Sequence, residues 1–131
     1  MNSKKKIAQG YVFLKPFNGI YLPTYIQNIL IKNLCDQKKF QFNLSINEHN
    51  IKNCWMELFS LVKKKNIDVI IMTSIYMLPN NKKDFAKFCK YLNKNHKDFF
   101  FILENKSITK LENLKKIVKN YNLYKKLNKI I

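Results

Sequence analysis

Apolar residues along the chain fall into two patterns, short continuous runs and longer stretches with helical spacing. The clearest run is Val69–Met72, inside the segment DVIIMTSIYMLPNN at residues 68–81. A run of this length and composition is typical of a strand that is buried on both faces. It predicts a central strand whose carboxyl end carries the hydroxyl groups of Thr73, Ser74 and Tyr76.

The same reading predicts further strands at residues 8–13, 40–46 and 99–103, with helices that begin near Thr24, Asn53, Asn81 and Thr109. Thr24 and Gln27 have the spacing of a helix-capping pair. In the second strand, Phe40, Phe42, Leu44 and Ile46 alternate with polar residues, which predicts an outer, half-exposed strand.

Alternating strands and helices indicate an α/β fold with right-handed crossovers. We expect three layers around a short parallel sheet of about four strands in the order 2-1-3-4, a flavodoxin-like arrangement. The length of 131 residues suits one domain. We predict a basic flexible tail at residues 1–6 and a single α/β domain at residues 7–131.

Polar residues gather where the predicted strands end, and in open α/β sheets ligands bind outside the carboxyl ends of the strands. The candidate catalytic residues at these ends are Lys15, Glu48, Ser74 and Tyr76. The candidate ligand-binding residues are Asn18, His49, Asn53 and Glu104.

These side chains match roles in acid–base chemistry. Glu48 or His49 would act as a general base, Lys15 as a carbonyl partner, and Ser74 or Tyr76 as a proton relay. For each of them a structural interpretation stays open, because a polar residue at a strand end is usually a loop residue that faces water.

The charge of the chain is +17, and all 25 basic residues are lysine. A basic surface attracts polyanions. Arginine, however, is the side chain best suited to bidentate contacts with phosphate and guanine, and the chain has none. We therefore do not expect sequence-specific DNA binding. The frequent Lys, Asn and Ile also match an AT-rich genome, so whether the charge serves a function stays open here.

Several classes of protein are not indicated. Cys35, Cys54 and Cys89 are far apart and form no CxxC pair, and His49 and His96 lack metal-ligand spacing, so we predict no metal site. With two glycines there is no phosphate-binding loop, and we predict no cofactor. No apolar run approaches ~18 residues, and no signal peptide is recognisable, so the expected location is cytoplasmic.

Most of residues 10–104 resembles the catalytic domain of serine recombinases of the resolvase and invertase type. The similar positions are residues 10–12, Gln27, residues 34–35, Glu48 and residues 68–81. The resemblance implies a resolvase-like fold. It does not imply the activity, because the positions of the nucleophilic serine and of three arginines carry Lys15, Phe13, Met77 and Asn80.

Nearly the whole chain is also similar to the sporadic carbohydrate cluster protein family, through residues 10–19, 27–28, 47–48, 53–54 and 74–79. This resemblance implies an accessory or enzymatic protein of bacterial surface-carbohydrate biosynthesis. It would bind a sugar, sugar nucleotide or sugar phosphate at the carboxyl edge of the sheet. The alternative is a non-catalytic resolvase-like module that binds a protein partner, a second copy of itself or, nonspecifically, nucleic acid.

Overall fold

The computed structural model describes residues 5–121 and has a mixed α/β fold, as predicted. Its elements, in chain order, are β1 (Ile7–Val12), α1 (Thr24–Lys38), β2 (Gln41–Asn47), α2 (Met56–Lys63), β3 (Val69–Met72), η1 (Ile75–Met77), α3 (Lys82–Lys94), β4 (Asp98–Phe101), β5 (Lys106–Ile108) and α4 (Leu111–Asn120).

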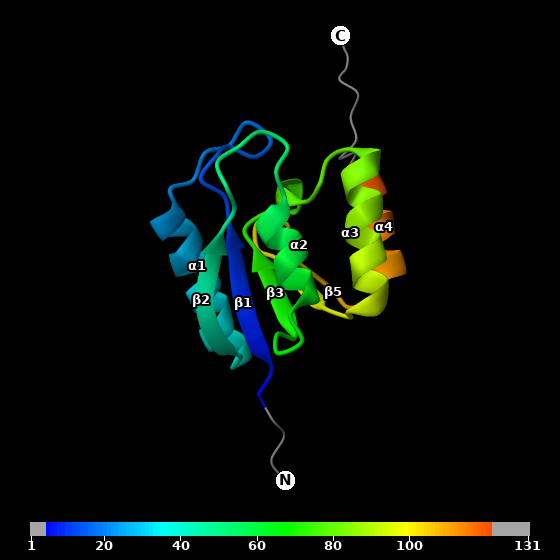
Figure 1. Cartoon of the computed structure of the whole chain (residues 1–131). Coiled ribbons are helices and arrows are strands. Elements are labelled where there is room, and N and C mark those ends of the chain that lie inside the picture. Colours follow the sequence, from blue (N-terminus) through cyan, green and yellow to red (C-terminus); the bar gives the residue numbers. More distant parts are fainter. Residues whose placement is uncertain (1–4, 122–131) are drawn as a thin grey trace.

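The strands form one sheet in the order β2-β1-β3-β4-β5 (Figure 1). The first four are parallel and follow the predicted order 2-1-3-4. The fifth, β5, was not predicted and runs antiparallel to β4, with Phe99 opposite Ile108. Its sequence, KSI, contains a single apolar residue and therefore gives no apolar run.

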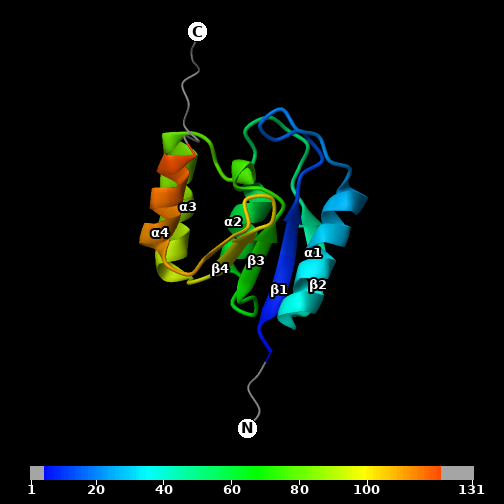
Figure 2. The ribbon, with the colours of Figure 1, turned by 180° about the vertical axis from the view of Figure 1, so that it is seen from behind.

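Helices cover both faces of the sheet, which confirms the three layers. The helix α1 lies on one face, and α2 and α3 lie on the other (Figures 1 and 2). The helix α4 lies next to α3 and contributes to the same hydrophobic core. Two hydrophobic cores follow from this arrangement. The larger includes Leu58, Phe88 and Ile117 from the three helices, and the smaller places Ile31 and Cys35 of α1 against Val69 and Ile71 of β3.

The strand β1 approaches α1 closely at Gly10. A Cβ added there would collide with Ser45 Oγ and would lie 2.9 Å from Ile31 Cδ1. The strand β2 has an irregularity at the same level, because Gln9 pairs with Asn43 whereas Tyr11 pairs with Ile46. A bulge of this kind adds a residue to one strand and locally breaks its alternation.

The bulge makes the predicted alternation of β2 wrong in part. Phe42 packs against the smaller core on the α1 side, whereas Ile46 packs against the larger core. Leu44 belongs to neither, and 81% of it is exposed. The sequence pattern did not indicate this change of face, because a bulge interrupts the alternation without a signal of its own in the sequence of β2.

Lys6, at the end of the predicted tail, contacts the sheet. Its carbonyl accepts a hydrogen bond from the Gln41 amide at 2.9 Å, and its ammonium group lies 2.9 Å from a carboxylate oxygen of Asp98. The boundary between a tail at residues 1–6 and a domain at residues 7–131 stays a prediction. Residues 1–4 of that tail and residues 122–131 of that domain lie outside the described residues. Between residues 5 and 121, no helix is long and apolar enough to cross a membrane.

Candidate functional site

The loops that follow β1 and β2 and the short helix η1 meet at the carboxyl edge of the sheet (top of Figure 1). This edge carries all eight candidate residues. The local structure of each loop determines which of their side chains face solvent and which are engaged by the protein itself.

The loop between β1 and α1 contains a tight two-residue turn. Asn18 and Gly19 both have positive φ, at 50° and 76°, and Phe17 and Ile20 exchange two backbone hydrogen bonds of 2.9 Å. Positive φ at both central positions is typical of a type I′ turn, which Asn-Gly favours. Asn18, a candidate ligand-binding residue, is thus an exposed turn residue.

Gln27 fixes the rest of this loop from within the protein. Its fully buried amide donates to the carbonyls of Phe13 and Leu22, both at 2.8 Å, and accepts from the Phe13 amide at 3.1 Å. The predicted capping pair is therefore wrong. No side chain caps the start of α1, because Gln27 is used to hold the loop.

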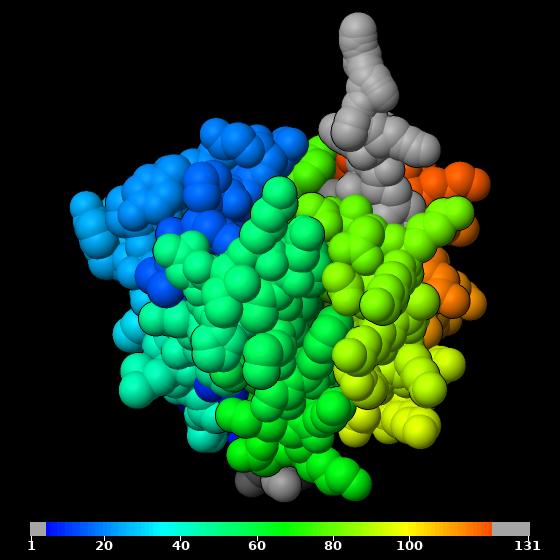
Figure 3. Space-filling view, turned by 45° about the horizontal axis from the view of Figure 1, so that its top comes forward, coloured from blue at the N-terminus to red at the C-terminus, as the bar shows by residue number. Residues whose placement is uncertain are grey.

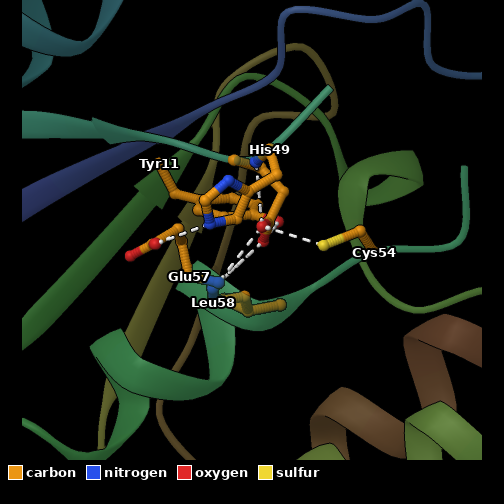
Figure 4. A network of polar contacts seen from close by, with 6 residues as sticks. Tyr11, His49, Cys54, Glu57 and Leu58 are labelled. Atoms are coloured by element: carbon orange, nitrogen blue, oxygen red, sulfur yellow. Dashed lines mark hydrogen bonds and ion pairs between the residues drawn. The ribbon is translucent and has the colours of Figure 1, made fainter. Parts of the chain in front are cut away.

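Glu48 has the largest number of polar contacts at this edge (Figure 4). One oxygen accepts from the Tyr11 hydroxyl at 2.7 Å and from the Leu58 amide at 3.2 Å, and the other accepts from the His49 amide at 3.0 Å. The Glu57 amide lies 3.1 Å from both oxygens. Glu48 is 1% exposed, so in this conformation its carboxylate has no access to a substrate.

The physical role of Glu48 is to cap α2 from a distance. The amides of Glu57 and Leu58 belong to the first turn of α2, and Trp55, at the N-cap position, supplies no side-chain hydrogen bond. A carboxylate at this place satisfies unpaired amides and interacts favourably with the helix dipole. Burial, followed by the negative charge of Glu48, raises the pKa of Tyr11 well above its usual value. Tyr11 therefore stays a proton donor to Glu48.

Cys54 and His49 surround the same carboxylate. The Cys54 sulfur lies 3.6 Å from Glu48 Oε2, and His49 Nε2 lies 2.9 Å from Glu57 Oε2 at the protein surface. Asn53 is exposed and has a φ of 54°, which marks it as a turn residue between them. This loop thus resembles a closed structural cap more than an open binding site.

A second polar group forms after β3. Ser74 is 1% exposed, donates to Glu104 Oε2 at 2.7 Å and accepts from the Tyr76 amide at 3.1 Å. The other oxygen of Glu104 accepts from the Ile75 amide at 2.9 Å. Ser74 and Glu104 together cap η1. The Tyr76 hydroxyl donates to the Tyr121 carbonyl at 3.4 Å, and burial raises the pKa of Tyr76.

Lys15 crosses the edge toward the loop after β2. Its ammonium group donates to the Ile51 carbonyl at 2.7 Å and lies 4.9 Å from the centre of the Phe13 ring and 5.8 Å from that of Trp55. Burial lowers the pKa of Lys15. The contacts with aromatic rings and with a carbonyl hold the charge in place.

The structure therefore separates the candidates into two groups, one around Glu48 and one around Glu104. Among residues 5–121, no hydrogen bond joins the two groups, and no cluster of three His, Cys, Asp or Glu side chains could hold a metal ion. Three open depressions of about 970, 570 and 430 Å³ lie at the amino-terminal edge and along the two sides of α1.

The fold has counterparts among solved structures. No family model matches the sequence, and no curated protein sequence matches it. The N-terminal catalytic domain of TP901-1 integrase aligns with a TM-score of 0.65 and 13% identity, over 89% of this chain and 94% of that one. A resolvase family site-specific recombinase from Streptococcus pneumoniae aligns with a TM-score of 0.63 and 9% identity, over 89% and 88%.

The fold is resolvase-like. At these identities the likeness concerns the fold alone. It confirms the fold that the recombinase resemblance implied, and it gives no support to the resemblance to the carbohydrate cluster family.

One surface of this resolvase-like fold, formed by α2 and α3, was not predicted from the sequence. Lys83, Lys87, Lys90 and Lys94 are spaced by four, three and four residues, so they form one exposed stripe along α3. Together with Lys63, at the end of α2, we call them the basic face. Figure 3 shows α2 and α3 side by side on this surface.

Aromatic rings lie between the lysines of the basic face. Lys63 Nζ is 4.1 Å from the centre of the Tyr91 ring, and Lys87 Nζ is 5.4 Å from that of Phe59. These two rings pack edge to face at 5.5 Å and join α2 to α3. The helical spacing of the four α3 lysines could have revealed their stripe, whereas the position of Lys63 beside them depends on the packing of α2 against α3.

The carboxylates of these two helices are already engaged. Glu57 contacts His49, and Asp84 accepts a hydrogen bond from the Asn81 side chain at 3.0 Å while its own amide is capped by Asn81. The basic face therefore keeps a strong excess of positive charge, which attracts anionic partners.

Proposed function

We propose that this chain is a non-catalytic module of resolvase-like fold that binds nucleic acid nonspecifically through the basic face. The observation that carries the proposal is the stripe of Lys83, Lys87, Lys90 and Lys94 beside Lys63, with aromatic rings between them. Lysines spaced along a helix suit the regularly spaced phosphates of a nucleic-acid backbone. A cytoplasmic location is part of this proposal.

Two further features support binding without catalysis or sequence readout. The absence of arginine removes the side chain best suited to reading guanine. The candidate acid–base groups Glu48 and Ser74 are 1% exposed and hydrogen bonded to backbone amides. Contacts to phosphates fix position and supply affinity without sequence information.

Fluorescence anisotropy with labelled duplex and single-stranded DNA, between 50 and 200 mM salt, tests the proposal. Each lysine–phosphate contact adds about −0.9 to the slope of log K against log salt for duplex DNA. The triple variant K63Q/K87Q/K90Q should flatten this slope by roughly 2.7 and weaken binding roughly 100-fold at low salt.

The matched control removes the same charge from the α1 side. The variant K38Q/K39Q/K106Q lowers the net charge equally but leaves the basic face intact, so it should bind within a few-fold of the natural chain. Absence of binding at 50 mM salt, or equal loss in both variants, would reject the basic face as the binding surface.

Surface-carbohydrate biosynthesis stays a prediction from sequence resemblance alone. It requires a sugar, sugar nucleotide or sugar phosphate at the strand ends, near Lys15 and Glu48. Thermal-shift measurements with nucleotide sugars and sugar phosphates distinguish it from the present proposal. Stabilisation by several degrees with one of these compounds would favour the carbohydrate function, and a flat response to all of them would count against it.

A further inference from the structure

The opposite side of the sheet carries an apolar surface that the proposed function does not use. Tyr25 and Ile29 lie one turn apart on α1 and are 66% and 52% exposed, and Leu44 at the bulge of β2 is 81% exposed. Ile29 and Leu44 line an open groove of about 570 Å³ between α1 and β2, which also includes Phe42. We call these four residues and their groove the neutral face.

The strand β2 is an edge strand without a single charged residue. Its sequence is QFNLSIN, in a chain where 25 of 131 residues are lysine. Edge strands are usually protected from other chains by lysine, by proline or by being short. The opposite edge, β5, follows that rule, since it has three residues and includes Lys106. A bulge can also protect an edge strand, but at the bulge of β2 the apolar side chain of Leu44 stays exposed.

The charges on α1 beside the groove cancel. Lys32 Nζ lies 3.4 Å from Asp36, one turn further along the helix. This local neutrality contrasts with the net charge of +17, which makes two copies of the chain repel each other over most other approaches. An uncharged surface also gives no electrostatic advantage to an acidic partner over a neutral one.

The polar rim of the groove is able to pair with itself. It contains the exposed amides of Asn33 and Asn47, and an amide side chain both donates and accepts hydrogen bonds. The same rim on a second copy therefore offers a matching group to each of them.

We infer that two copies of this chain associate through their neutral faces about a two-fold axis. In such an interface the same patch meets itself, so a projecting side chain and the groove that receives it must belong to one surface. Leu44 projects beside the groove formed by Ile29 and Phe42, which meets this requirement. Each Leu44 enters the groove of the other copy, and the amide rims face each other.

The dimer would carry a basic face on each outer side. The helix α1 and the helices α2 and α3 cover opposite faces of the sheet (Figures 1 and 2), so association through α1 leaves both basic faces free. The inference does not depend on nucleic-acid binding, because it rests on a different surface.

Sedimentation equilibrium or light scattering of the whole chain between about 5 and 100 µM measures the association. The natural chain should approach twice its mass of 15.8 kDa, and more readily at high salt because screening reduces repulsion. Leu44→Lys should weaken the dimer at least about 30-fold, because it places an ammonium group in an apolar groove.

Leu103→Lys is the matched control, since Leu103 is 50% exposed at the turn after β4 and the charge change is identical. It should leave the dimer intact. Circular dichroism melting of both variants monitors folding. Ile29→Lys is a second substitution on the neutral face and should also weaken the dimer. A monomeric natural chain at 100 µM, or a dimer that survives both Leu44→Lys and Ile29→Lys, would overturn the inference.

Discussion

The two sides of the sheet are built in different ways. On the side of α2 and α3, a buried carboxylate organises the backbone and lysines cover the surface. On the side of α1, close apolar packing organises the backbone, and the surface near β2 is neutral. In a chain with a charge of +17, α3 thus carries a stripe of lysines whereas β2 carries none. The comparison shows that net charge alone does not describe the local charge of each surface.

The larger effect on stability is expected on the side of α2. Glu48→Ala should lower the free energy of unfolding by about 3 kcal/mol, because it leaves two helix amides and the buried Tyr11 hydroxyl without an acceptor. Glu48→Gln should cost less, about 1–2 kcal/mol, since a neutral acceptor remains. Urea denaturation measures both values.

The control for this prediction is Glu112→Ala, at the exposed start of α4. It should change stability by less than about 0.5 kcal/mol. If Glu48→Ala were as stable as Glu112→Ala, the carboxylate would not be the cap of α2.

An intermediate effect is expected on the side of α1. Gly10→Ala should cost about 1–3 kcal/mol, because the new methyl group collides with Ser45 Oγ and crowds Ile31. Removing a methyl group from the neighbour, as Ile31→Val, should recover part of this loss. A double-mutant cycle measured by urea denaturation quantifies the coupling.

Gly19→Ala gives a useful contrast to Gly10→Ala. A Cβ at Gly19 would meet nothing within 4 Å, and the expected cost of about 1 kcal/mol comes from its φ of +76° alone. Ile31→Val should not improve this variant. Equal rescue of both glycine variants would contradict the steric explanation for Gly10.

A further effect concerns the pH dependence of the core under α1. Burial raises the pKa of Cys35 from 9.0 to about 11. Between pH 9 and pH 11 the folded thiol therefore keeps its proton while the unfolded thiol loses it. The contribution of the thiol to the free energy of unfolding is complete below pH 9 and is lost as the pH rises toward 11. Between pH 8 and 10.5 the natural chain should lose on the order of 2 kcal/mol more than Cys35→Ala.

The change in the free energy of unfolding between the two pH values is taken for each protein separately. This difference removes the constant cost of the cavity in Cys35→Ala. Lysine titration affects both proteins alike and cancels in the difference. Parallel losses in the two proteins would mean that the thiol ionises equally in the folded and unfolded states.

The fold was largely predictable because local patterns carry it. Apolar runs such as residues 69–72 and 99–103 indicated the strands, and the alternation of strands with helices indicated a parallel sheet and its order. The strand β5 and the bulge beside Leu44 were not predictable. The strand is too short to form a pattern, and the bulge is a shift in the pairing of β2 with β1, which lies elsewhere in the sequence.

The place of the candidate residues in the fold was predictable, their contacts were not, and their chemical roles stay predictions. The polar residues do lie at the carboxyl edge, as the topology requires. Their roles depend on contacts with distant backbone amides, such as those between Glu48 and Leu58 or between Glu104 and Ile75. Strand-end spacing does not reveal such contacts. The position of Lys63 of α2 beside the lysines of α3 was not predicted either, because it depends on how the two helices pack.

The uncharged edge of β2 also affects the colloidal behaviour of the protein. Repulsion among lysines keeps separate molecules apart, but a polyanion that neutralises them removes this protection while leaving the edge available. Mixtures in which phosphate and lysine charges balance should therefore turn turbid, whereas an excess of either component should restore a clear solution. The ratio of the two charges, and not protein concentration alone, then controls when this protein condenses.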